Sequence, residues 1–128
     1  MEGRQRQEIL IVDNDERVLQ VMDSFLTNAG FDTKTASDGQ AALTLLQLQV
    51  YDLVLVADHL ADFSLGDFLA ELQRFGPRLS VIVMESALSR PWESGQCRVV
   101  GARKVVSKWR PCEVLAAASE AISNRERI

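Results

Sequence analysis

The feature that most constrains this chain is an apolar run, Leu53–Ala57, that stops abruptly at Asp58. All five residues of the run are apolar, so a strand formed here would have both faces covered, which is typical of a parallel sheet between two helix layers. In such sheets the ligand site lies beyond the carboxyl ends of the strands. Asp58 therefore falls where a parallel-sheet protein does its chemistry, although an aspartate here could equally cap the following turn.

Four more segments predict strands. Ile9–Val12 and Leu79–Met84 are largely apolar, Phe31–Ala36 alternates with one wetter face, and Arg103–Ser107 forms a fifth strand. Helical patterns and short loops separate these segments, and strands that alternate with helices form right-handed βαβ units. The sequence therefore predicts an α/β fold, a doubly wound five-stranded parallel sheet with helices on both faces.

Three helices with clear apolar faces are expected before the fourth strand. The first should begin near Asp15 or Glu16 and end at Gly30, and Ser37-Asp38-Gly39 should cap the second. Their spacing is that of amphipathic helices. The predicted buried residues are Val18, Val21, Met22, Phe25, Leu26 and Ala29, then Ala42, Leu45, Leu46 and Leu48, then Phe68, Leu69 and Leu72.

Two further helical segments follow. Ser89–Val100 is the poorest candidate in the chain because it contains Pro91 and Gly95, so we expect it to be short or irregular. Pro111 is expected to open a last helix, and Ser123–Ile128 to fray. The predicted buried residues of the last helix are Val114, Leu115, Ala118, Ala121 and Ile122.

Length and charge narrow the classes of function. A chain of 128 residues fits a single domain over 1–128, with an ordered core at about 8–123. A formal net charge of −4 without a Lys/Arg block argues against nucleic-acid binding by this domain. The N-terminus lacks the apolar core of a signal peptide, and no run approaches membrane-spanning length, so we expect a cytoplasmic protein. Cys97 and Cys112 are expected to be reduced thiols.

Polar residues follow four of the predicted strands, at one edge of the sheet. They are Asp13, Asn14 and Asp15 after the first, Asp58 after the third, Glu85 and Ser86 after the fourth, and Lys108 after the fifth. Clustered carboxylates repel unless a cation lies among them, and Mg²⁺ prefers such oxygen ligands. A lysine ammonium would hold an anionic group such as phosphoryl. Together these residues indicate a phosphoryl-accepting carboxylate, with a nearby hydroxyl that responds to it.

Five segments together resemble the receiver domain of bacterial two-component response regulators, over nearly the whole chain. They are ILIVDND, NAGFDTKTASDGQAAL, YDLVLVAD with Gly66 eight residues beyond Asp58, VIVMESA and GARKVVSK. In that family an acidic pair binds Mg²⁺, and a strand-end aspartate accepts phosphoryl from a histidine kinase or phosphotransfer protein. A lysine and a Thr or Ser complete the site.

The resemblance implies a role for each residue that matches the pattern. Asp13 and Asn14 take the places of the acidic pair and, with Asp58, would hold the metal. Asp58 would be the phosphoacceptor, Lys108 the lysine and Ser86 the switch hydroxyl. The signal would leave through the face of the fourth helix and fifth strand, toward a downstream protein or an output domain in a longer chain.

Several positions depart from the family pattern. Asp62 and Trp109 stand where the family usually has prolines, and Val105 where it has a switching aromatic. Asn14 removes one charge from the acidic pair, so we expect Mg²⁺ to be held more weakly, with Asp15 as an auxiliary ligand.

The acceptor position itself has two possible alignments. The family places the acceptor five residues after the Asp that opens the strand, which counts from Asp52 to Ala57, whereas counting back from Gly66 selects Asp58. A shift of one residue turns a strand side chain to the other face. We expect a one-residue bulge that returns Asp58 to the shared site. The same ambiguity leaves either Glu85 or Ser86 at the hydroxyl position.

Three functions compete. The leading hypothesis is a non-enzymatic phosphoacceptor signalling domain. The alternative is a degenerate receiver that acts as a phosphorylation-independent interaction module, which the altered acid, the missing prolines and the displaced acceptor favour. Asp13-Asn14-Asp15 also resembles the nucleophile motif of haloacid dehalogenase-like phosphatases, but 128 residues leave little room for the cap and later acidic motif of that family.

Overall fold

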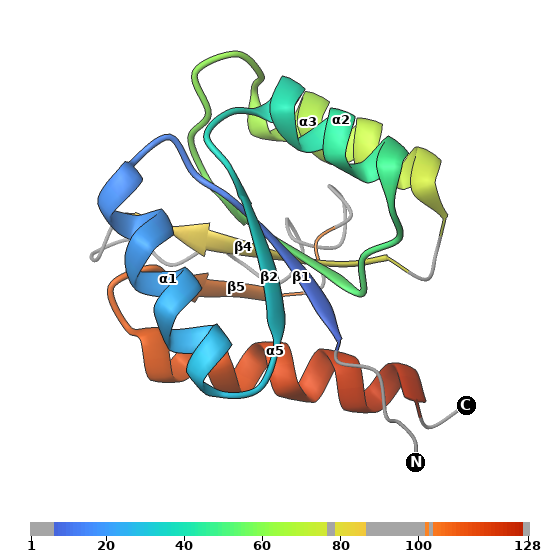
Figure 1. Cartoon of the computed structure of the whole chain (residues 1–128). Coiled ribbons are helices and arrows are strands. Elements are labelled where there is room, and N and C mark those ends of the chain that lie inside the picture. Colours follow the sequence, from blue (N-terminus) through green and yellow to red (C-terminus); the bar gives the residue numbers. More distant parts are fainter. Residues whose placement is uncertain (1–6, 77–78, 87–101, 103, 127–128) are drawn as a thin grey trace.

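The computed structural model describes residues 7–76, 79–86, 102 and 104–126, with side chains to Ser123 (Figure 1). Strands and helices alternate along it as the sequence predicts. The elements are β1 (Glu8–Val12), α1 (Glu16–Asn28), β2 (Asp32–Ala36), α2 (Gly39–Leu48), β3 (Leu53–Ala57), α3 (Leu65–Leu72), the 3₁₀ helix η1 (Gln73–Phe75), β4 (Ser80–Glu85), β5 (Lys104–Ser107) and α5 (Pro111–Glu126).

The strands form one parallel sheet in the order β2-β1-β3-β4-β5. Helices α1 and α5 cover one face and α2 and α3 the other (Figure 1). The predicted doubly wound α/β fold is therefore confirmed. Because every strand runs in the same direction, the carboxyl ends of β1, β3, β4 and β5 meet at one edge of the sheet, and the predicted site residues lie there.

Side-chain alternation along the central strands divides the core into two layers. Ile11 and Leu55 pack toward α1 and α5, whereas Val12 and Val56 pack toward α2 and α3. All of β1 from Ile9 and all of β3 are fully buried. The burial of β3 on both faces is what the unbroken apolar run Leu53–Ala57 predicts.

Polar side chains fix the starts of three helices. Asp15 accepts a hydrogen bond from the N–H of Arg17 at the start of α1, Asp38 from Ala41 in α2, and Ser64 from Asp67 in α3. These caps satisfy N–H groups that have no partner within the helix. Gly30 follows α1 at φ 105°, a conformation that glycine adopts readily.

The buried faces of α1 and α2 differ in part from prediction. In α1 the core face is Val18, Leu19, Met22 and Leu26, so Leu19 is buried while Val21 is 52% exposed and Ala29 is also exposed. Leu48, the last residue of α2, is 76% exposed.

The C-terminal half follows the prediction more closely. Phe68, Leu69 and Leu72 of α3 are buried, and so are Val114, Ala118, Ala121 and Ile122 of α5. Helix α5 continues to Glu126, past the predicted start of fraying at Ser123. The predicted helix Ser89–Val100 lies outside the described residues. Among the helices that the structure describes, none is long and apolar enough to cross a membrane.

Candidate functional site

Asp13 and Lys108 form a buried ion pair at the carboxyl edge of the sheet. Asp13 follows β1 directly and its side chain is fully buried, while that of Lys108, just after β5, is 7% exposed. Lys108 Nζ lies 2.8 Å from Asp13 Oδ2, and Asp13 Oδ1 accepts a hydrogen bond from the N–H of Asp15 at 2.9 Å. Asp13 Oδ1 thus has a hydrogen bond, whereas Oδ2 has the charge of Lys108 beside it but no hydrogen bond among the described atoms.

Asp58 and Ser86 form a second pair at the same edge. Asp58 follows β3, half-buried, and its N–H continues the sheet by bonding the carbonyl oxygen of Met84. Asp58 Oδ2 accepts the N–H of Ser86 at 3.1 Å, and Asp58 Oδ1 accepts the Ser86 hydroxyl at 3.0 Å. One carboxylate therefore receives two donors from a single exposed serine.

The two pairs are separate, because the described hydrogen bonds of the Asp58 carboxylate go to Ser86 and not to Lys108.

Pairing of β3 with β4 is one-to-one from Leu53 to Ala57, so the predicted bulge within this strand is wrong. Val12 pairs with Val56, so this register, continued by one residue, sets Asp13 opposite Ala57, which is fully buried.

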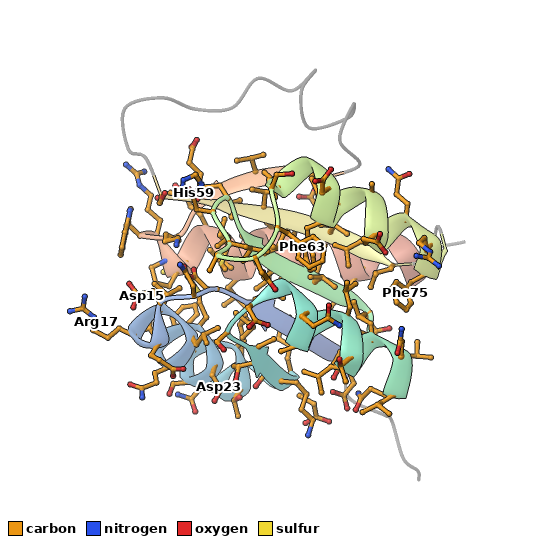
Figure 2. All side chains as sticks on the ribbon, turned by 90° about the horizontal axis from the view of Figure 1, so that it is seen from above. Asp15, Arg17, Asp23, His59, Phe63 and Phe75 are labelled. Carbon is orange, nitrogen blue, oxygen red and sulfur yellow. The ribbon has the colours of Figure 1, made fainter. Side chains whose placement is uncertain are left out.

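The other predicted site residues are spread along the edge. Asn14 is exposed, and Asp15 caps α1 beside Arg17, whose side chain extends into solvent (Figure 2). Glu85 is only 7% exposed, and its Oε1 has no hydrogen-bond partner among the described atoms. Glu85 and Ser86 are neighbours that differ sharply in exposure, and Ser86 is the one that contacts Asp58.

The described side chains form no ready-made cluster for Mg²⁺, an ion that proteins also bind through one or two carboxylates with water as the other ligands. A divalent ion of this kind takes several oxygen ligands. Within the described ranges, no group of three or more Asp, Glu, His or Cys side chains could hold a metal ion. The Asp13 carboxylate is already bonded to Lys108 and the backbone of Asp15, so the Lys108 ammonium supplies the positive charge at this point.

Asp62 has a structural role that the sequence alone did not reveal. Its carboxylate accepts the N–H groups of Gly39 and Gln40, each at 2.9 Å, and so ties the β3–α3 loop to the start of α2. The ring of Phe63 lies directly against Gly39, where a Cβ would collide with it (Figure 2). Burial acts to raise the pKa of Asp62, but the backbone hydrogen bonds outweigh it and lower that pKa. The only sequence signal was the missing proline.

Trp109 is the second residue whose position at the site was not predicted. Its Nε1–H donates to the carbonyl oxygen of Ser86 at 2.8 Å, and Lys108 Nζ lies 5.9 Å from the ring centroid. The side chain nevertheless stays 52% exposed. His59, by contrast, is exposed, and its Nδ1 lies 3.3 Å from the carbonyl oxygen of the preceding Asp58 (Figure 2).

Known structures share this fold over almost the full chain. A response regulator receiver domain protein from Methanospirillum hungatei JF-1 superposes with a TM-score of 0.86 at 21% identity, covering 96% of this chain and 98% of that one. The signal receiver domain of an HD domain-containing protein from Pseudomonas fluorescens Pf-5 gives 0.80 at 28% identity, covering 100% and 98%.

Sequence relatives are longer proteins. The transcriptional regulatory protein ZraR of Klebsiella oxytoca is 31% identical over 77 residues, which is 60% of this chain and 17% of that protein. The alginate biosynthesis transcriptional regulatory protein AlgB of Pseudomonas putida is 32% identical over 76 residues, or 59% and 17%. The chain thus matches less than a fifth of the length of these relatives.

The family model for the response regulator receiver domain matches residues 9–120, from the second residue of β1 into α5. That range takes in β1 from Ile9, the other four strands in full and every predicted site residue. On this match and on the fold, the chain belongs to the response regulator receiver domain family of two-component signalling.

Proposed function

We propose that this receiver domain accepts a phosphoryl group on Asp58. The observation that supports the proposal is the accessibility of this carboxylate beside a hydroxyl. Asp13 is fully buried and paired, Asp15 caps α1, and Glu85 is buried. Asp58 is half-buried and bonded to the hydroxyl and N–H of Ser86, two donors that suit phosphoryl oxygens.

The proposed reaction is direct transfer from a phosphohistidine. An Asp58 oxygen attacks phosphorus, an acyl-phosphate P–O bond forms, and the P–N bond breaks with its electron pair returning to the imidazole of the donor. Ser86 then turns its hydroxyl from the carboxylate to the new phosphoryl oxygens. The partner that donates phosphoryl is a histidine kinase or phosphotransfer protein, and the signal passes to a downstream protein or to an output domain.

Acetyl phosphate labelling tests the acceptor. Wild-type protein incubated with acetyl phosphate and Mg²⁺ is expected to gain the mass of one phosphoryl group, and beryllofluoride to shift the backbone amide resonance of Ser86. Asp58→Asn should abolish both effects. Asp62→Asn is the matched control, because it makes the same chemical change in the same loop, and it should keep both. Labelling that survives Asp58→Asn would contradict the proposal.

A second candidate function is a phosphorylation-independent interaction module. It is favoured by the register of β1 with β3, which, continued by one residue, sets the fully buried Ala57 rather than Asp58 opposite Asp13. In that case wild type takes no label, whereas Ala57→Asp, which adds a carboxylate opposite Asp13, gains it. Labelling of wild type at Asp58 would rule this candidate out.

A further inference from the structure

We propose that Trp109 couples the chemical state of the Asp58 carboxylate, through Ser86, to the shape of a cavity beside α1 that Trp109 itself lines. The role of this coupling in signalling rests on the proposed function of Asp58 as the phosphoacceptor. The coupling itself is a property of the unphosphorylated protein and can be measured there.

A continuous chain of hydrogen bonds carries this inference. The Ser86 N–H and hydroxyl both donate to the Asp58 carboxylate, and the Ser86 carbonyl accepts from Trp109 Nε1 at 2.8 Å. Ser86 is therefore held from both sides, by a carboxylate on its amide and by an indole on its carbonyl. A rotation of its backbone breaks or bends both contacts together.

A chemical change at Asp58 must disturb this arrangement. The Ser86 N–H donates to Asp58 Oδ2, and the Ser86 hydroxyl donates to Oδ1 at 3.0 Å with a longer contact of 3.3 Å to Oδ2, so both carboxylate oxygens accept from Ser86. A carboxamide has one acceptor oxygen and an NH₂ that only donates. An acyl phosphate likewise takes one of the two oxygens into a covalent bond. In either case only one oxygen of residue 58 stays free to accept from Ser86, so the Ser86 N–H and hydroxyl must rearrange, and the Ser86 carbonyl that accepts from Trp109 shifts with them.

Trp109 also lines a cavity that is open to other molecules, so a movement of its ring changes an exposed surface. Together with Val21, Arg17 and Pro111 it lines a cavity of about 410 Å³ between α1 and the start of α5. Val21 and Trp109 are each 52% exposed, although both are large apolar side chains. When the indole leaves Ser86, one wall of this cavity moves, so the state of Asp58 alters the shape of an exposed apolar surface.

A single-tryptophan protein tests the first step. In a Trp92→Phe background, the fluorescence and the indole N–H resonance report on Trp109 alone. Asp58→Asn and Ser86→Ala are expected to shift both signals, because each removes a hydrogen bond between residues 58 and 86 that orients residue 86. Asp62→Asn carries the same change of charge but bonds Gly39 and Gln40 instead, so it should leave both unchanged. An unmoved Trp109 in Asp58→Asn, or an equal shift in Asp62→Asn, would overturn the proposal.

The second step is tested with Trp109→Phe, which keeps a ring but lacks the N–H donor. Asp58→Asn is expected to shift the backbone amides of both Ser86 and Val21. In the Trp109→Phe background the Ser86 shift should remain and the Val21 shift should be lost. A Val21 shift that persists without the indole N–H would show that Trp109 does not carry the signal. Failure of phosphoryl labelling leaves these measurements intact, so the two proposals fail separately.

Discussion

At the scale of single residues, the Asp13–Lys108 pair carries the largest desolvation cost of the site, because both of its charges are buried. Both side chains are removed from water, and desolvation of two charges offsets much of their attraction. The pair is stable because Asp13 also accepts the N–H of Asp15, which satisfies its other oxygen. Loss of either partner would leave an uncompensated charge in the protein interior.

Lys108→Met should therefore destabilise the protein strongly, by about 3–5 kcal/mol in free energy of unfolding, because it leaves Asp13 buried without its partner. Urea unfolding measures the effect, and adding Asp13→Asn should recover part of the loss. Lys104→Met is the control: Lys104 lies 3.8 Å from Glu120 with both side chains more than half exposed, so its loss should change stability by less than about 1 kcal/mol. Equal losses of stability in Lys108→Met and Lys104→Met would contradict the description of Asp13 and Lys108 as a buried ion pair.

The sequence predicted these residues better than it predicted their contacts. Asp13, Asp58, Ser86 and Lys108 all lie at the predicted edge, because apolar runs locate strand ends reliably. The division into two pairs depends on a one-residue register between β1 and β3, and both alignments are compatible with the same apolar pattern. Trp109 stood out only as a missing proline, since nothing in its neighbouring residues predicts a partner just after β4.

At the scale of elements, α5 differs from α1 in how it meets the sheet. Its buried face contains Ala117, Ala118 and Ala121, which lets the helix backbone approach closely. In α1 the core face includes Leu19, and Val21 is left beside the cavity. Spacing alone favoured Val21, because residues on the flank of an amphipathic stripe can be buried or exposed depending on how the helix is rotated.

Ala118→Leu should lower the free energy of unfolding by about 1–3 kcal/mol, because Ala118 is fully buried and the added carbons have no free space. Ala116→Leu makes the same change on the exposed side of the same helix. Leu and Ala both favour helices, so this control should change stability by less than about 0.5 kcal/mol. Thermal and urea unfolding would compare the two, and a well-tolerated Ala118→Leu would show that α5 packs less closely than described.

At the scale of the whole molecule, the fold follows from sequence because its determinants are local. Five strand segments and the helical patterns between them are compatible with few parallel arrangements, since connections are right-handed and short. The site is less predictable because it depends on where four chain segments end relative to one another. A shift of one residue would still leave apolar side chains on both faces of β3, but it would exchange Ala57 for Asp58 at the position opposite Asp13.

Metal binding at this edge would appear in the stability of the entire domain, because a ligand that binds only the folded state raises its free energy of unfolding. With Asp13 held by Lys108 and Asn14 uncharged, about 10 mM Mg²⁺ should stabilise wild type by no more than about 0.4 kcal/mol, as expected for a Kd near that concentration. Asn14→Asp adds a carboxylate at an exposed position beside Asp13 and should increase the shift in melting temperature. NaCl at matched ionic strength controls for screening. If wild type and Asn14→Asp respond equally to Mg²⁺, the metal binds elsewhere or the Asp13–Lys108 pair opens to admit it.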